Sequence, residues 1–201
     1  GAVIATLDTK PSGSFSSVSG VSWSPDDSRL VVWSGSGHMR MFRTDPLEPG
    51  TEPVEPLALL TEGKLELFRL GVAWSADGRR LIGEASERPQ RCSLWSGETG
   101  KRLKTWEARG NVSFADRQPL WSHDSSRWAR IAANGAVHVH DPNGETLVEI
   151  PTKGVEVHRF AWATDGLRLA TVGGWPGPAA LWDGVTGERI ADLEGGAERL
   201  A

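Results

Sequence analysis

Apolar and polar residues alternate along four stretches of the chain, and turn-forming residues interrupt each stretch near its middle. An alternation with a period of two is typical of a half-buried strand, and a glycine-bearing break between two such runs indicates a hairpin. The stretches are Leu30 to Phe42, Leu81 to Trp95, Trp128 to His140 and Leu169 to Trp182, with breaks at Ser34 to Gly37, Ser86 to Pro89, Asn134-Gly135 and Gly173 to Gly177. The pattern predicts four antiparallel hairpins.

A short segment that begins with tryptophan precedes each hairpin. The four segments are WSPDDSRL from Trp23, WSADGRRL from Trp74, WSHDSSRW from Trp121 and WATDGLRL from Trp162. Each has tryptophan, a small residue, aspartate, a turn former, arginine and an apolar residue in the same order. The intervals between them fall in or just beyond the range of about 40 to 50 residues that is typical of propeller blades. The chain is therefore predicted to repeat one supersecondary unit.

A second turn follows the last three hairpins, written WSGETGKRL from Trp95, HDPNGETLV from His140 and WDGVTGERI from Trp182. A further alternating run follows the turn, such as Arg102 to Trp106, and adds a fourth strand to the unit. Helix has little room, because 24 glycines and 12 prolines recur along the chain. The predicted fold class is all-β, with four four-stranded antiparallel sheets and one leading outer strand.

The order Trp-Ser-x-Asp-Gly-x-x-Leu, then a hairpin, then Leu-Trp-Asp-x-x-Thr-Gly resembles the WD-repeat β-propeller family, in a divergent and bacterial-like form, over nearly the whole chain. Trp182-Asp183 matches the dipeptide that names the family, and its counterparts are Phe42-Arg43, Trp95-Ser96 and His140-Asp141. The Gly-His pair before the innermost strand and the aspartate of the hairpin turn are missing. The resemblance therefore implies the blade fold without the family's buried polar tetrad, so tryptophans wedged between blades should carry more of the stability.

The resemblance implies one partial propeller domain over residues 1–201. Its blades are expected at about 15–61, 67–107, 111–150 and 155–193, and residues 1–7 are expected to be the outer strand of a preceding blade. Propellers usually close into rings of about 4 to 8 blades, so the two end faces of this array need a cover. Additional blades of the parent chain or a second copy in a homo-oligomer are the two alternatives.

Composition narrows the choice of partners. The formal charge of −4 provides no uniform positive field that would attract nucleic acid or an anionic membrane. The lone Cys92 cannot form an internal disulfide, and no apolar stretch approaches the roughly 18 residues needed to span a bilayer. No signal-peptide pattern is recognised at the start of the sequence. We expect a cytoplasmic protein with protein partners, and neither nucleic acid nor membrane.

Two groups of residues could suggest chemistry. Ser122-His123-Asp124 has the letters of a hydrolase triad, but contiguous residues cannot converge as nucleophile, base and orienting group, so a turn is predicted instead. His138 and His140 share one face of a strand and could place two imidazoles on a metal, although no third ligand is evident. Because His140 occupies the repeat position of Trp95 and Trp182, packing is the favoured interpretation.

Met39, Met41 and Cys92 fall at inward-facing positions of the hairpins and are expected in the core rather than at a soft-metal or nucleophilic site. We therefore expect no catalytic residue, no metal site and no cofactor.

In the resembled family, partners often meet the face formed by the hairpin loops and the loops that link blades. These loops carry His38, Arg88, Arg91 and Trp175, the expected partner-binding residues. Arginine and tryptophan are common interface anchors, and Trp175 belongs to no repeat position that packing would explain. The expected function is a non-catalytic protein-interaction scaffold or sensor module.

Two alternatives to a scaffold remain at this stage. One is a propeller-type hydrolase or lyase with a site in the central channel, and the other is a fragment that completes a ring with another copy. The channel is expected near Val21, Val72, Pro119 and Phe160, which are apolar and therefore do not favour the enzyme.

Overall fold

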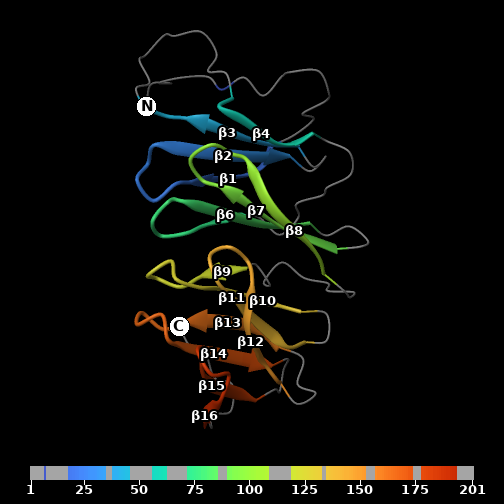
Figure 1. Ribbon diagram of the computed structural model, residues 1–201, viewed down its shortest axis with the longest axis vertical. Helices are drawn as coiled ribbons and strands as arrows, with labels where there is room; N and C mark the ends of the chain where they lie inside the picture. Colours follow the sequence, from blue (N-terminus) through green and yellow to red (C-terminus); the bar gives the residue numbers. More distant parts are fainter. Residues whose placement is uncertain are drawn as a thin grey trace. The chain divides into compact units, whose positions relative to one another are not determined.

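The computed structural model describes residues 7, 18–34, 38–45, 56–62, 72–85, 90–108, 119–132, 135–152, 157–173 and 178–193. These residues form β-strands and turns, and none of them is helical. Figure 1 shows the strands gathered into four sheets. In every sheet the strands follow the order of the sequence, so neighbours in the sheet are also neighbours along the chain. The predicted fold class is confirmed.

The chain forms two compact units, residues 1–107 and 108–201. The first unit contains the β1–β4 and β5–β8 sheets. Its strands are β1 (Val18–Trp23), β2 (Arg29–Ser34), β3 (His38–Arg43), β4 (Ala58–Glu62), β5 (Val72–Trp74), β6 (Arg80–Ala85), β7 (Gln90–Ser96) and β8 (Arg102–Ala108). The second unit contains the β9–β12 and β13–β16 sheets. Its strands are β9 (Leu120–Trp121), β10 (Trp128–Ile131), β11 (Val137–His140), β12 (Thr146–Ile150), β13 (Val157–Trp162), β14 (Arg168–Gly173), β15 (Ala179–Asp183) and β16 (Arg189–Leu193).

The four leading tryptophans occupy one register position. Each ends the first strand of its sheet and lies opposite the apolar residue that the repeat places seven positions later. The pairs are Trp23 with Leu30, Trp74 with Leu81, Trp121 with Trp128 and Trp162 with Leu169. The sequence repeat is therefore a repeat of three-dimensional structure.

The Trp-Ser-x-Asp segment forms the turn between the first two strands of a sheet. Ser24 Oγ donates to Asp26 Oδ1 at 2.6 Å and accepts the N–H of Arg29 at 2.9 Å. Hydrogen bonds from Ser24 and then from Ser28 lower the pKa of Asp26 to about 2. The same serine and aspartate contact recurs in the next two sheets, which explains why the sequence repeats both residues.

Alternation places one face of each sheet against its neighbour within the unit. In the first unit, Val31, Met39 and Met41 of the first sheet pack with Leu81 and Trp95 of the second. In the second unit, a corresponding core joins the β9–β12 and β13–β16 sheets. Its buried members are Ala129, Ile131, Val137, Val139, Ile150, Val157, Phe160, Leu169, Ala180 and Trp182. These cores hold the sheets face to face.

The predicted leading strand is only partly described. Leu7 alone lies within the described part of that segment, where it forms an isolated β-bridge. Its side chain packs against Leu30, Val32 and Phe42, on the face of the first sheet that points away from the second. Residues 1–6 lie outside the described residues.

Candidate functional site

Each unit presents two rims formed by the ends of its strands. One rim carries the hairpins between second and third strands and the links between sheets. The other carries the Trp-Ser-x-Asp turns and the second turns, such as Ser96 to Gly100. Equivalent strand ends lie on the same side of a unit, because Trp74 Nε1 donates to the carbonyl of Ser22, which is the neighbour of the equivalent Trp23.

Two of the four predicted partner-binding residues lie on the hairpin rim of the first unit. His38 opens β3, is half-buried, and its backbone N–H donates to Ser34 Oγ at 3.3 Å. Arg91 lies near the start of β7, opposite Ala85 of β6, and its side chain is exposed. Arg88 and Trp175 lie outside the described residues, and their assignment to a partner stays a prediction. The rim therefore presents one exposed basic side chain and one partly covered imidazole.

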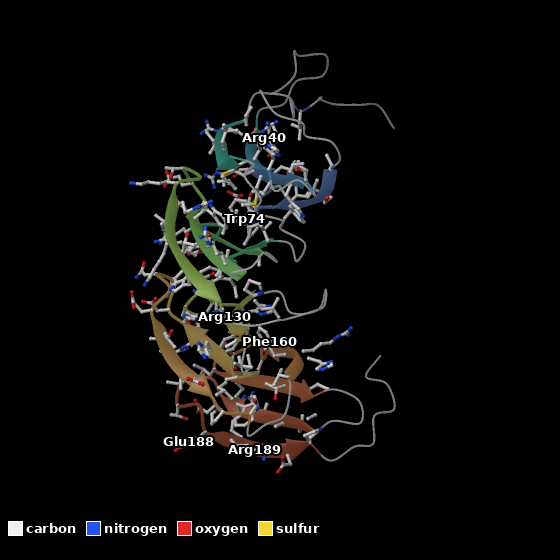
Figure 2. All side chains as sticks on the ribbon, turned by 90° about the vertical axis from the view of Figure 1, so that its right-hand side faces the viewer. Arg40, Trp74, Arg130, Phe160, Glu188 and Arg189 are labelled. Carbon is white, nitrogen blue, oxygen red and sulfur yellow. The ribbon has the colours of Figure 1, made fainter. Side chains whose placement is uncertain are left out.

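Arg40 follows His38 on the same face of β3 and is almost fully buried (Figure 2). It lies opposite Val32 of β2 and Leu59 of β4. The equivalent positions in the other sheets hold Ser93, His138 and Ala180. Sequence reasoning missed this buried guanidinium, although a basic residue between Met39 and Met41 in a core strand was a visible signal.

The tryptophans that lead the second sheet of each unit bond to the sheet before them. Trp74 Nε1 donates to the Ser22 carbonyl at 3.4 Å, and Trp162 Nε1 donates to the Leu120 carbonyl at 3.2 Å. Trp95 adds a further bond in the first unit, from its Nε1 to the carbonyl of Leu60 at 3.2 Å. These three tryptophans therefore bridge neighbouring sheets, as expected, and their contribution to stability stays a prediction.

The last sheet contains a buried polar pair, although it lacks the histidine and aspartate that are common in the WD-repeat proteins it resembles. Trp182 Nε1 donates to Thr171 Oγ1 at 2.8 Å, and both side chains are buried. Arg189 lies over the Trp182 ring, with its guanidinium carbon 5.6 Å from the ring centroid. A cavity of about 60 Å³ borders this pair and is also lined by Thr152 and Val157.

In the β9–β12 sheet, the position equivalent to Trp182 is occupied by a histidine. His140 replaces the tryptophan, and its ring stacks on Trp128 with centroids 4.0 Å apart. Arg130 Nε donates to His140 Nε2 at 3.3 Å, so the histidine proton resides on Nδ1, which faces Thr146 Oγ1 at 3.2 Å. Burial, and secondarily the charge of Arg130, lowers the pKa of His140 to about 3. The packing interpretation of His140 is confirmed.

His138 and His140 share a face, as predicted, but their surroundings do not favour a cation. Their ring centroids lie 6.2 Å apart, and Arg130 acts on both rings. His138 Nε2 lies 3.7 Å from Glu149 Oε2, while burial and then the charge of Arg130 lower the pKa of His138. Among the described residues no cluster of three or more histidine, cysteine, aspartate or glutamate side chains could hold a metal ion.

Ser122, His123 and Asp124 form a turn and not a catalytic group. Ser122 Oγ donates to Asp124 Oδ1 at 2.6 Å, and this bond is the main cause that holds the pKa of Asp124 below its usual value. His123 is exposed and takes no part in that bond. The arrangement matches the turns at Ser24 and Ser75, so its role is structural.

The three sulfur-bearing side chains of the hairpins lie in the core, as expected. Met39 and Met41 are fully buried in the first unit, and the free Cys92 is also buried. No helix in the described part of the chain is long and apolar enough to cross a membrane.

Comparison with known proteins identifies the fold. Neither a protein-family model nor a curated protein matches the chain. Among solved structures, the C-terminal WD40 domain of Sif2 superposes with a TM-score of 0.68 at 17% identity, over 90% of this chain and 47% of that one. The computationally designed Ika8 protein superposes with a TM-score of 0.64 at 18% identity, over 94% of this chain and 52% of that one. This chain has the WD40 propeller fold.

The four sheets are thus WD40 blades, and the resemblance drawn from the Trp-Ser-x-Asp and Trp-Asp-x-x-Thr-Gly motifs is confirmed at the level of fold. The chain spans about half the length of the two solved structures. The hairpin rim with His38 and Arg91 remains the candidate site, since the described blade interiors are filled by apolar side chains and closed polar pairs.

Proposed function

We propose that this chain is a non-catalytic protein-interaction scaffold or sensor module, which holds loops of the hairpin rim in fixed positions for a protein partner. The observation that carries the proposal is the WD40 fold itself, in which the two blades of each unit place their central hairpins at the same rim of that unit. Rigid presentation lowers the ordering entropy that a partner must overcome on binding, which is why such scaffolds bind through loops.

The chemistry of the described rim fits this role. Arg91 is exposed next to a hairpin, and arginine is enriched at the centre of protein interfaces. Val72 and Phe160, at the positions where the channel is expected, are buried apolar residues and supply no acid, base or nucleophile. Both observations support binding in preference to turnover.

Site-specific crosslinking tests the proposal. A photoreactive amino acid at position 91 is compared with one at Lys101, an exposed residue in the opposite rim of the same blade. After irradiation in cells, position 91 should yield discrete protein adducts and position 101 should yield at least severalfold fewer. Equal labelling from both rims, or no adduct at position 91, would contradict a partner on the hairpin rim.

Trp175, which the sequence predicts to bind a partner, provides a second test once an adduct identifies that partner. Trp175→Ala should weaken capture of that partner and leave the melting temperature of the chain nearly unchanged. A large fall in melting temperature would assign Trp175 to packing. Lys101→Ala serves as the matched control and should change neither quantity.

A further inference from the structure

The cavity beside Trp182 lies between the two blades of the second unit, and we call it the Thr171 cavity. One wall residue follows β12, and the others belong to the β13–β16 blade or directly precede β15. The wall consists of Thr152, Val157, Thr171, Pro178, Ala180, Trp182 and Arg189. Its volume is about 60 Å³, whereas a single water needs about 10–15 Å³ of such space. The cavity therefore has room for a ligand of a few non-hydrogen atoms.

Most of the wall of the Thr171 cavity is apolar and buried. Val157, Ala180 and Trp182 belong to the core between the two blades. Pro178 and Arg189 are the exposed members of the wall, so they lie where the cavity meets solvent. An apolar wall that carries a few polar groups is typical of small-molecule sites.

One of these polar groups is a buried hydrogen-bond donor. Thr171 is 4% exposed, and its Oγ1 accepts the N–H of Trp182 at 2.8 Å. A hydroxyl can accept and donate at once, yet within the described part of the chain the Thr171 hydroxyl donates to no atom. Because Thr171 lines the cavity, its O–H is available to a ligand. The register equivalent of Thr171 in the first unit is Gly83, which has no hydroxyl.

Thr152 supplies the complementary acceptor. Its Oγ1 donates to the carbonyl of Gly135 at 3.1 Å, so its proton is already used while its oxygen can still accept. Thr152 is buried and lines the same cavity as Thr171. A ligand hydroxyl satisfies both groups, because it can accept from Thr171 and donate to Thr152.

The charges around the cavity favour a neutral ligand. The Arg189 guanidinium pairs with the Asp192 carboxylate of the same strand and lies over the Trp182 ring. Asp192 therefore already balances the cationic side chain of the wall. The Trp182 N–H is also used, since it donates to Thr171. An anion buried here would find one free neutral donor, which does not compensate for the loss of its hydration.

The corresponding groups of the first unit bond to the neighbouring blade instead. Trp95 has the register position of Trp182, and Arg102 lies over its ring as Arg189 lies over Trp182. Trp95 Nε1 and Arg102 Nη2 both donate to the carbonyl of Leu60 in the preceding blade. In the second unit, Trp182 and Arg189 bond to side chains of their own blade. The polar groups of the second unit are thus arranged around the cavity and not across it.

We propose that the Thr171 cavity binds a small neutral alcohol. The ligand hydroxyl accepts from Thr171 and donates to Thr152, and its aliphatic carbons lie against Val157 and Ala180. This inference goes beyond the proposed function, because the site lies inside the second unit and uses no residue of the hairpin rim. A ligand that binds only the folded chain also stabilises it, so the site would couple the second unit to the concentration of a solute.

Isopropanol is the probe, and nuclear magnetic resonance of the chain labelled with ¹⁵N at its tryptophan indoles is the measurement. The ten tryptophans each contribute one N–H signal, and the Trp182 signal is the one lost in Trp182→Phe. Isopropanol should shift the Trp182 signal and saturate the shift in the millimolar range, which is the affinity that so small a ligand can reach. The signal of Trp95, which is bonded to Leu60, is the internal control and should stay nearly unchanged.

Acetone tests the role of the ligand hydroxyl. It has almost the shape of isopropanol and can accept from Thr171, but it cannot donate to Thr152, so it should bind about three- to tenfold more weakly. Thr152→Val should remove this advantage of isopropanol over acetone. Thr171→Val should weaken both probes by about three- to tenfold, because it removes the donor that they share.

Filling the cavity tests its location. Ala180→Leu places a larger side chain in the cavity and should abolish the isopropanol shift. Ala161→Leu makes the same change at an exposed position of the same sheet and should leave the titration unchanged. Circular dichroism of each variant should show the wild-type β spectrum. If Ala180→Leu fails to fold, Ala180→Val narrows the same space and should weaken binding at least severalfold.

Three results would overturn the proposal. A Trp182 signal that drifts linearly with isopropanol and never saturates would show that the cavity takes up water only. A saturable shift that persists in the folded Ala180 variant would place the alcohol elsewhere. Equal affinities of the wild-type chain for isopropanol and acetone would show that the ligand hydroxyl is not recognised.

Discussion

The β9–β12 and β13–β16 blades share one register but fill its central buried position in different ways. In the last blade, Trp182 donates to Thr171, a neutral pair of side chains from adjacent strands. In the blade before it, His140 accepts from Arg130 and stacks on Trp128. Trp182 and His140 correspond because Leu169 and Trp128 lie opposite them in the two sheets.

The difference teaches that this position requires complementary donors and acceptors more than a particular residue. In both blades a ring fills the space and its polar atom meets a partner on the second strand, so no buried ring nitrogen of Trp182 or His140 at this contact is left without a hydrogen bond. The two solutions differ in charge, however. The last blade is neutral there, whereas the β9–β12 blade buries a guanidinium against a histidine that must stay neutral.

Removing the ring from the last blade should produce the largest effect. Trp182→Ala leaves a cavity in the core of the second unit and deprives Thr171 of its donor, so the free energy of unfolding should fall by about 3–5 kcal/mol. Urea denaturation followed by circular dichroism measures the loss. Trp182→Phe keeps most of the ring and should lose about 1–2 kcal/mol. A loss below about 1 kcal/mol for Trp182→Ala would mean that the ring does not hold the blade.

Acid should produce the second-largest effect, and it should act through the β9–β12 blade, which contains His140. Because His140 is buried with a pKa of about 3, and an unfolded histidine titrates near 6.5, the unfolded chain binds an additional proton between these values. Stability is therefore complete above about pH 6.5 and falls as the pH decreases, by on the order of 3 kcal/mol down to about pH 4. The measurement is the free energy of unfolding against pH.

His140→Phe supplies the control for this acid effect. It keeps an aromatic ring on Trp128 but cannot titrate, so the dependence on pH should become markedly shallower, with His138 contributing the remainder. An unchanged slope in His140→Phe would show that other groups cause the acid sensitivity.

An effect of intermediate size is expected when the buried residues of one blade are replaced by those of the other. Replacing Trp128, Arg130 and His140 by leucine, threonine and tryptophan gives the β9–β12 blade the residues of the last one. The triple variant should be more stable than the sum of the single variants predicts, with a coupling energy of about 1–3 kcal/mol. Urea denaturation of the single and triple variants measures this energy. Additive losses would mean that the two positions are equivalent in register but not in environment.

The smallest expected effect comes from the hydroxyl of the neutral pair. Thr171→Val preserves shape and removes the acceptor of the Trp182 N–H, so the free energy of unfolding should fall by about 1 kcal/mol. Thr146→Val in the other blade alters a more exposed contact of His140 and should cost less. Thermal unfolding of both variants ranks them, and a reversed order would contradict the importance given to burial.

Much of each blade could be predicted from local sequence. The alternation of Leu81 to Trp95 defined a hairpin, and the serine and aspartate of the leading segment formed the expected turn, because both depend on neighbours a few residues away. The partner-binding site could be predicted only as a set of loops. His38 and Arg91 lie on the expected rim, but which side chains meet a partner depends on a surface that no local pattern specifies.

The sequence by itself determined the repeat, the four-stranded order and the register, since strand alternation and turn chemistry are local properties that each blade contains in full. Only the tertiary structure decided what covers each blade. Val21 and Val72 occupy the same repeat position, yet one is exposed and the other buried, and Trp74 finds its acceptor 52 residues earlier in the chain. Burial depends on which surface packs opposite, and neighbouring blades supply that surface from distant parts of the sequence.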